Sequence, residues 1–172
     1  MEHFKDEISS FNPKEKSDEE NNRFTDCCKH LFDNEDDFKY LSFTGIKHTD
    51  DLHDYWRKSF DPANKEYLVV KDNLEIIGLC IIIKDILDKF EILGLIVDKN
   101  YRRKNIATKL LLAAEKKAAE YGFKAVHLKV FCDNQAMLIN VIKLGYKPII
   151  IEHHKRYDGE DLLTLVKCFK KW

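Results

Sequence analysis

The chain has 172 residues, 44% of them hydrophobic, and a formal net charge of −1, which suits one soluble globular domain with a sizeable core. No apolar run reaches the roughly 18 residues that a membrane span requires. The charged start, MEHFKDEISSF, lacks the apolar region of a secretory signal. These features exclude a membrane protein, and we expect a single domain over residues 1–172.

The five cysteines are odd in number and lack the spacing of a zinc site. Cys80 and Cys168 lie in apolar runs, so we expect both to be buried thiols. The histidine pair His153-His154 alternates faces on a strand, and we assign no metal. A reduced, cytoplasmic protein fits this cysteine usage best.

The charge is unevenly distributed along the chain. Residues 1–37 hold 12 acidic and 5 basic residues, whereas residues 99–172 hold 16 basic and 7 acidic ones. A basic half suits a polyanionic ligand, and nucleic acid is one candidate. Because the chain has no zinc finger, no RNP aromatic motif and no basic low-complexity arm, we expect a small anionic cofactor and no nucleic acid.

The N-terminal part predicts a strand at His3–Phe11 and a helix with a narrow apolar stripe at Glu15–Phe32. The acidic cluster at residues 33–37 is expected to be a solvated loop, with attraction of a cationic substrate as the alternative. Phe38–Phe43 reads as a strand or an ordered loop.

A helix capped by Thr49 or Asp50 is predicted to run to Phe60. Its aromatic residues Tyr55 and Trp56 are assigned to core packing, with substrate contact as the alternative.

The central part predicts three strands joined by short turns, which form an antiparallel meander. They are Glu66–Asp72, Leu74–Lys84 and Phe90–Val97, with Gly94 marking a bulge or a close backbone approach in the third. A helix follows at Ile106–Tyr121 and ends at Gly122.

The C-terminal part predicts a strand at Ala125–Phe131, parallel to the third strand because a helix joins the two. A second helix is expected from Asn134 to Gly145, followed by strands at Tyr146–Glu152 and Asp161–Phe169. The pattern predicts one mixed α/β sheet flanked by helices.

A basic turn, Arg102-Arg103-Lys104, links the third strand to the first long helix. The first N–H groups of a helix lack internal partners and lie at the positive end of its dipole. A phosphate bound there accepts their hydrogen bonds and places negative charge at that positive end. A solvated basic turn is the alternative interpretation.

The segment Arg102-Arg103-Lys104-Asn105-Ile106-Ala107 resembles the acetyl-CoA motif [RQ]-x-x-G-x-[GA] of the GCN5-related N-acetyltransferases (GNAT). Asn105 replaces the usual Gly, but Asn tolerates a left-handed backbone well. The resemblance implies a mixed sheet of about six to seven strands, with residues 66–172 as the acetyl-CoA-binding core. It also implies that backbone groups of the following residues bind pantetheine or pyrophosphate: Leu95, Ile96, Val97, Arg102, Arg103, Lys104, Asn105, Ile106, Ala107 and Thr108.

A second segment, from Asn134 to Gly145-Tyr146, resembles the family pattern N-x-x-A-x-x-x-Y-x-x-x-G-[FY] and adds Asn134 to the cofactor-binding set. The family tyrosine, often the acid for the departing thiolate, falls on Val141. Tyr157 and Cys132 are the predicted substitutes. The alternative is that no acid is needed, because a thiol has a pKa near 8.5 and the thiolate can leave with help from solvent.

Glu91 lies eleven residues before Arg102, which resembles the position of the catalytic glutamate in histone-type members. We expect it to be the base that deprotonates the amine; a solvated glutamate at a hairpin rim is the alternative. The loop Arg156–Leu163 resembles that of ribosomal-protein and N-terminal α-amino acetyltransferases.

We therefore expect an N-acetyltransferase that moves an acetyl group from acetyl-CoA to a primary amine, either a small molecule or a peptide N-terminus. A non-catalytic acyl-CoA-binding sensor is the alternative. A homodimer through edge strands or the C-terminal hairpin is compatible with the fold.

Overall fold

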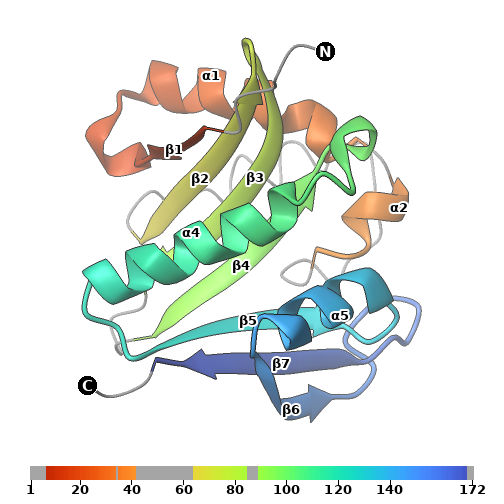
Figure 1. Cartoon of the computed structure of the whole chain (residues 1–172). Helices are drawn as coiled ribbons and strands as arrows, with labels where there is room; N and C mark the ends of the chain where they lie inside the picture. Colours follow the sequence, from red (N-terminus) through yellow and green to blue (C-terminus); the bar gives the residue numbers. More distant parts are fainter. Residues whose placement is uncertain (1–6, 34, 42–63, 85–88, 170–172) are drawn as a thin grey trace.

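The computed structural model describes residues 7–33, 35–41, 64–84 and 89–169. Figure 1 shows a twisted central sheet with α4 and α5 lying across it. Within these residues the sheet has seven strands in the order β1-β2-β3-β4-β5-β7-β6, which confirms the predicted mixed sheet. The predicted helix that contains Tyr55 and Trp56 lies outside the described residues.

The N-terminal elements are β1 (Ile8–Phe11), η1 (Pro13–Glu15), α1 (Asp18–Cys28) and η2 (Lys29–Leu31). A capping box starts α1, because Ser17 and Glu20 exchange side-chain and backbone hydrogen bonds. The predicted strand is confirmed at Ile8–Phe11, and the predicted helix at Asp18–Cys28. The ends predicted for the helix are wrong, because Lys16 and Ser17 are extended and Lys29–Leu31 form a 3-10 turn.

The acidic cluster was expected to be a loop, and this prediction is wrong for its second half. Residues Glu35–Phe38 form the short helix α2. The three acids occupy its first turn, where the helix dipole favours negative charge, and the Phe38 side chain is buried. The acidic residues are therefore compatible with a helix start, and the burial of Phe38 stabilises the helix.

The predicted meander consists of β2 (Lys65–Asp72), β3 (Glu75–Lys84) and β4 (Phe90–Val97), paired antiparallel. The β3–β4 register shifts where Ile81 faces Gly94 but Ile82 faces Ile92. This shift leaves one extra residue in β4, so the bulge predicted at Gly94 is confirmed.

The second half consists of η3 (Lys99–Tyr101), α4 (Ile106–Glu120), β5 (Ala125–Phe131), α5 (Gln135–Lys143), β6 (Lys147–Glu152) and β7 (Leu162–Cys168). Gly122 and Gly145 follow the two helices with φ of 82° and 93°, as expected of residues that end a helix in the left-handed region. β4 and β5 are parallel neighbours, as predicted.

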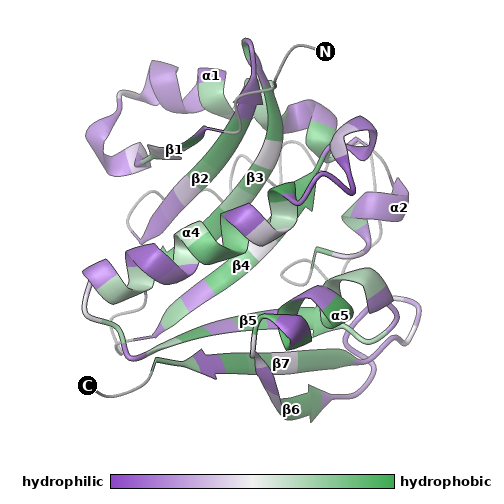
Figure 2. Cartoon of the chain, viewed as in Figure 1, coloured by the Kyte–Doolittle hydropathy of each residue, from purple (hydrophilic) through white to green (hydrophobic). Residues whose placement is uncertain are grey.

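Two apolar cores lie on opposite faces of the sheet. In β2, Leu68 and Val70 join the core under α4 and α5, whereas Tyr67 and Val69 join the core with α1. Gly78 on β3 lets α4 pack closely, because an added Cβ would lie 2.9 Å from Ile106 Cγ2. Figure 2 shows the matching apolar colour along the central strands.

The predicted burial of the two cysteine side chains is right for one and wrong for the other. Cys80 lies in the middle of β3 and is fully buried, whereas Cys168 is exposed. Cys168 is the last residue of β7 and pairs with Ala125 at the end of the sheet, where less structure covers it. Among the described residues, no helix is long and apolar enough to cross a membrane.

Candidate active site

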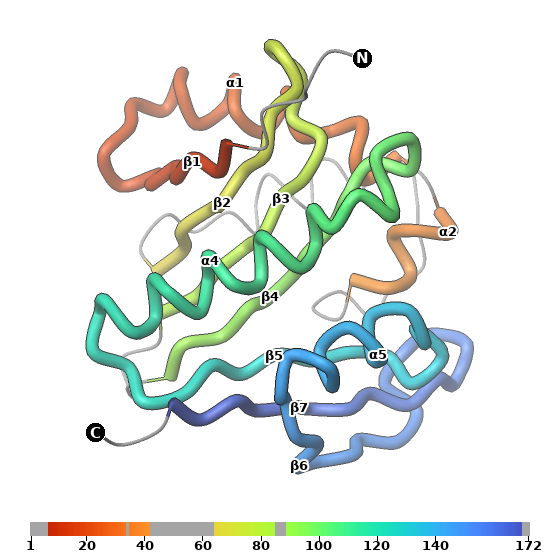
Figure 3. Tube along the Cα trace, in the orientation of Figure 1, coloured from red at the N-terminus to blue at the C-terminus, as the bar shows by residue number. Residues whose placement is uncertain are grey.

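The site begins where two parallel strands separate. β4 and β5 pair only from Phe90–Ile92 to Val126–Leu128, and their carboxyl-terminal halves then diverge, as the traces in Figure 3 show. The bulge in β4 lies just beyond the last paired residue. Ligands of α/β sheets bind outside the carboxyl ends of such strands.

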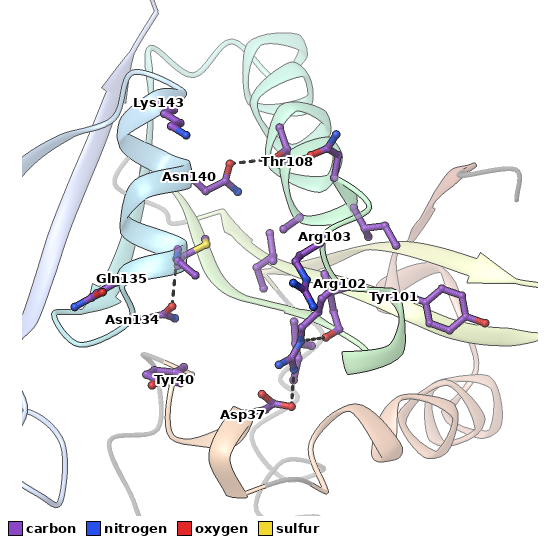
Figure 4. A pocket seen from close by; sticks show the side chains of 18 of the residues that line it. Asp37, Tyr40, Tyr101, Arg102, Arg103, Thr108, Asn134, Gln135, Asn140 and Lys143 are labelled. Atoms are coloured by element: carbon purple, nitrogen blue, oxygen red, sulfur yellow. Dashed lines mark hydrogen bonds and ion pairs between the residues drawn. The ribbon is translucent and has the colours of Figure 1, made fainter.

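A cavity of about 930 Å³ occupies this opening. Its walls come from α2 and the turn after it, the end of β4, the turn before α4, α4 itself, and α5 (Figure 4). The lining residues are Asp37, Tyr40, Leu95, Ile96, Val97, Tyr101, Arg102, Arg103, Asn105, Ile106, Ala107, Thr108, Asp133, Asn134, Gln135, Ala136, Met137, Asn140 and Lys143. Most of the predicted cofactor-binding residues are thus brought together.

The turn before α4 has an unusual backbone. Arg103 and Asn105 both have positive φ, 61° and 63°, and Asn105 is the N-cap residue of α4 in the left-handed region. The Asn105 side chain makes no cap hydrogen bond, so it does not satisfy the first N–H groups of the helix. These N–H groups lie at the cavity wall, and an anion is the ligand that such a terminus favours.

The three cations of this turn have different roles. Arg102 Nη2 lies 2.6 Å from Asp37 Oδ2, and its Nε donates to the Val97 carbonyl at 3.1 Å. Lys104 is not among the described lining residues, and its Nζ lies 4.7 Å from the centroid of the Tyr101 ring. Arg103 lines the cavity and has no ion pair among the described residues, so it is the cation best placed for an anionic ligand.

Helix α5 forms the opposite wall. Asn134 caps it by accepting a hydrogen bond from the Met137 backbone N–H at 3.2 Å. Thr108 Oγ1 donates to Asn140 Oδ1 at 3.0 Å, which connects α4 to α5 at the cavity (Figure 4). Val141, one residue further, is fully buried in the core, so this position offers no proton donor to the cavity.

The loop between β6 and β7 is fixed by a buried arginine. Arg156 forms a two-bond contact with Asp133, at 3.1 and 2.7 Å, and also binds Asp158. Its guanidinium group lies 4.9 Å from the centroid of the Phe131 ring. Because Asp133 precedes Asn134, this contact fixes the start of α5 and therefore one wall of the cavity.

The predicted proton donors lie outside the described cavity lining. Tyr157 is 46% exposed on the loop, next to the buried Arg156. Cys132 is partly buried, and burial together with the carboxylates of Asp161, Glu160 and Asp133 raises its pKa. The Cys132 thiol is therefore protonated at neutral pH, as a proton donor must be.

Glu91 also lies outside the cavity lining, near the base of the opening. Its Oε2 atom lies 2.7 Å from Lys89 Nζ, and its side chain is 19% exposed. It pairs in register with His127 on β5, so both side chains lie on the same sheet face. Burial and the nearby charge of Lys89 lower the pKa of His127, which is therefore neutral at pH 7.

Several lining residues were missed by the sequence analysis. Asp37 and Tyr40 were missed because they lie far from the basic turn in sequence. Asn140 and Lys143 could have been found from the sequence. Asn134, Met137, Asn140 and Lys143 are spaced three residues apart, and residues at this spacing lie on one side of a helix. Among the described residues, no three His, Cys, Asp or Glu side chains group closely enough to hold a metal ion.

Comparison with known proteins gives a family match. Residues 9–146 match the model of the acetyltransferase (GNAT) family. No curated protein matches the chain in sequence.

Solved structures share the fold at low identity. The ribosomal-protein-S18-alanine N-acetyltransferase from Escherichia coli superposes with a TM-score of 0.71 and 16% identity, over 96% of this chain and 95% of that one. An aminoglycoside 6′-acetyltransferase of type Ii superposes with a TM-score of 0.70 and 19% identity, over 96% of this chain and 99% of that one. A Bacillus subtilis acetyltransferase in complex with CoA superposes with a TM-score of 0.65 and 17% identity, over 95% of this chain and 98% of that one.

Proposed function

The chain belongs to the acetyltransferase (GNAT) family, whose members use acetyl-CoA, and we propose that it transfers the acetyl group to a primary amine. The observation that carries this proposal is the cavity between the diverging ends of β4 and β5, with the N-terminus of α4 at its wall. One elongated, anionic ligand can contact both features.

The proposed cofactor site uses the residues predicted from the sequence. The N–H groups at residues 105–108 and the Arg103 side chain would hold the diphosphate. The backbone of Leu95, Ile96 and Val97, which β5 leaves unpaired, would hydrogen-bond to pantetheine. Asn134 would contact the same arm from the opposite wall.

In the proposed reaction the neutral amine attacks the thioester carbonyl, an N–C bond forms and the C–S bond breaks. Glu91 would accept the proton of the amine, directly or through water. The thiolate would take a proton from solvent, or from Tyr157 or Cys132 if the bound substrates bring either within reach. The position of Glu91 on β4, in register with the neutral His127 on β5, supports its proposed role as the base.

Two acceptor classes remain within this proposal. The Arg156–Leu163 loop, fixed by the Arg156–Asp133 contact, and the likeness to the ribosomal-protein-S18-alanine enzyme support a peptide N-terminus. The likeness to the aminoglycoside enzyme supports a small-molecule amine. All five cysteines are free, which supports the proposed cytoplasmic location.

A non-catalytic acyl-CoA sensor is the second candidate, because Asn105 and the buried Val141 both depart from the family pattern. Calorimetric titration with acetyl-CoA tests the cofactor site, with dephospho-acetyl-CoA titrated in parallel. Thiol release with a panel of amines and peptides then tests turnover.

The variant Glu91→Gln separates the two candidates. For an enzyme we expect kcat to fall at least about a hundredfold at neutral pH while acetyl-CoA affinity stays unchanged. Binding without any turnover in the wild type would favour the sensor. No binding at all would overturn the proposed function.

A further inference from the structure

The charged residues that line the cavity leave two cations without a counter-ion. Five described lining residues are charged: Asp37, Arg102, Arg103, Asp133 and Lys143. Both carboxylates are used within the protein, since Asp37 lies 2.6 Å from Arg102 Nη2 and Asp133 lies 2.7 Å from Arg156 Nη2. Arg103 and Lys143 have no ion pair among the described residues, so the cavity offers two separate positive charges to a ligand.

The two unpaired cations lie in different parts of the cavity. Arg103 belongs to the turn at the N-terminus of α4, whereas Lys143 is exposed on the last turn of α5, at the opposite end of that helix from Asn134 (Figure 4). Between these ends, Asn140 accepts the hydrogen bond from Thr108 in the first turn of α4. Lys143 follows Asn140 by three residues and so lies about 4.5 Å farther along α5.

Acetyl-CoA carries two separate phosphate groups. A diphosphate joins pantetheine to adenosine, and a phosphomonoester on the 3′ oxygen of the ribose carries a charge of about −1.5 to −2 at pH 7. Because only the ribose separates these groups, the phosphomonoester lies near the diphosphate, on the side away from pantetheine. In the proposed site, pantetheine meets Asn134 and the diphosphate meets the first turn of α4, so the 3′-phosphate falls toward Lys143.

We propose that Lys143 binds the 3′-phosphate of acetyl-CoA, so that the protein selects acetyl-CoA over dephospho-acetyl-CoA. This inference rests on the proposed function and adds to it a residue that determines cofactor specificity. A lysine suits this role, because its ammonium group is a point charge with three donors on a flexible stem and can follow a partly solvated phosphate. The competing role is purely structural, since a cation in the last turn also interacts favourably with the helix dipole.

The test is calorimetric titration of the full chain with acetyl-CoA and with dephospho-acetyl-CoA. We expect the wild type to bind acetyl-CoA about three- to tenfold more tightly than dephospho-acetyl-CoA, as for an exposed charge pair. Lys143→Met keeps most of the stem and removes the charge. It should lower the acetyl-CoA affinity to that of dephospho-acetyl-CoA and leave the dephospho-acetyl-CoA affinity unchanged.

Two further variants serve as controls. Arg103→Met removes the cation proposed for the diphosphate, which both ligands contain, so it should lower both affinities by the same factor and keep their ratio. Lys147→Met removes an exposed lysine of β6 that lies outside the cavity lining, and it should change neither affinity. Circular dichroism melts of each variant report folding and any loss of helix stability.

The ratio of the two affinities decides the inference. Equal binding of both ligands by the wild type would overturn it and leave the proposed function standing. A Lys143→Met variant that keeps the wild-type ratio would also overturn it, and a lowered melting temperature in that variant would then identify the structural role. Binding of neither ligand by the wild type would overturn the proposed function and this inference with it.

Discussion

Asn105 stands at the point where the basic turn becomes helix α4. Its φ of 63° and ψ of 12° place it in the left-handed region, which costs most residues other than glycine about 1 kcal/mol or more. Asn is the side chain that adopts this region most readily after Gly. The departure from the family motif is therefore compatible with the turn that the motif needs.

Replacing Asn105 tests whether this backbone holds the cofactor. We expect Asn105→Ala to lower the free energy of unfolding by about 1 kcal/mol and to weaken acetyl-CoA binding several-fold. Asn105→Gly should keep or improve the affinity, because Gly reaches positive φ without a steric cost. Thermal melts and calorimetric titration measure the two effects.

Asn73 provides the control for this prediction. It has a φ of 54°, but it lies on the exposed β2–β3 turn outside the cavity lining. Asn73→Ala should lose similar stability and keep the wild-type acetyl-CoA affinity. If Asn105→Ala binds acetyl-CoA as tightly as the wild type, the turn is not part of the cofactor site.

At the scale of elements, α2 brings an acid to the basic side of the cavity. The Asp37 carboxylate lies 2.6 Å from Arg102 Nη2, and its side chain is only 18% exposed. A diphosphate bound at the adjacent turn would place further negative charge near Asp37. In the proposed complex the Asp37 carboxylate would therefore repel the diphosphate and neutralise Arg102, the cation next to Arg103.

We predict that Asp37→Asn tightens acetyl-CoA binding about three- to tenfold, which corresponds to roughly 1 kcal/mol for a partly exposed pair. The affinity for dephospho-acetyl-CoA should increase by the same factor, because this compound keeps the diphosphate. Glu35→Gln makes a similar charge change on α2 at an exposed side chain outside the described cavity lining, and it should leave the affinity unchanged. Weaker binding by Asp37→Asn would mean that the ion pair shapes the site instead.

The elements differ in how well the sequence predicts them. β4, the turn, α4 and α5 were predictable because apolar spacing, Gly122 and Gly145 are local signals. The helix α2 was not, because its stability depends on burying Phe38 against a sheet that forms from later residues. The Asp37–Arg102 pair joins segments that only the folded sheet brings together.

At the scale of the whole molecule, one buried carboxylate joins four elements. Glu66 on β2 is 2% exposed. Ser10 on β1 donates to it at 2.6 Å, and Tyr121 after α4 donates at 2.8 Å. Lys117 on α4 and Lys84 on β3 both pair with it, Lys84 at 3.4 Å. These contacts fix the C-terminal end of α4 to the first half of the sheet.

The partners of Glu66 determine its titration. Burial alone would raise the pKa of the carboxyl, but hydrogen bonds from Lys117, Ser10 and Tyr121 outweigh burial and lower it to about 2. The ordinary pKa of a glutamate is 4.5, which we take for the unfolded chain. The folded state therefore gains stability from this group above pH 4.5 and loses it as the pH falls toward 2.

We predict that Glu66→Gln lowers the free energy of unfolding by about 3 kcal/mol at pH 7 and removes much of the stability loss between pH 4.5 and 2. Denaturant unfolding across this pH range measures both effects. Glu120→Gln, which removes an exposed pair with Lys116 on the same helix, should change stability by less than about 0.5 kcal/mol. Equal acid sensitivity of Glu66→Gln and the wild type would contradict the assignment.

Because Glu66 contacts the C-terminal end of α4 and the cavity lies at its N-terminal end, the folded Glu66→Gln variant should bind acetyl-CoA like the wild type. Stability and cofactor affinity are therefore separable along this one helix.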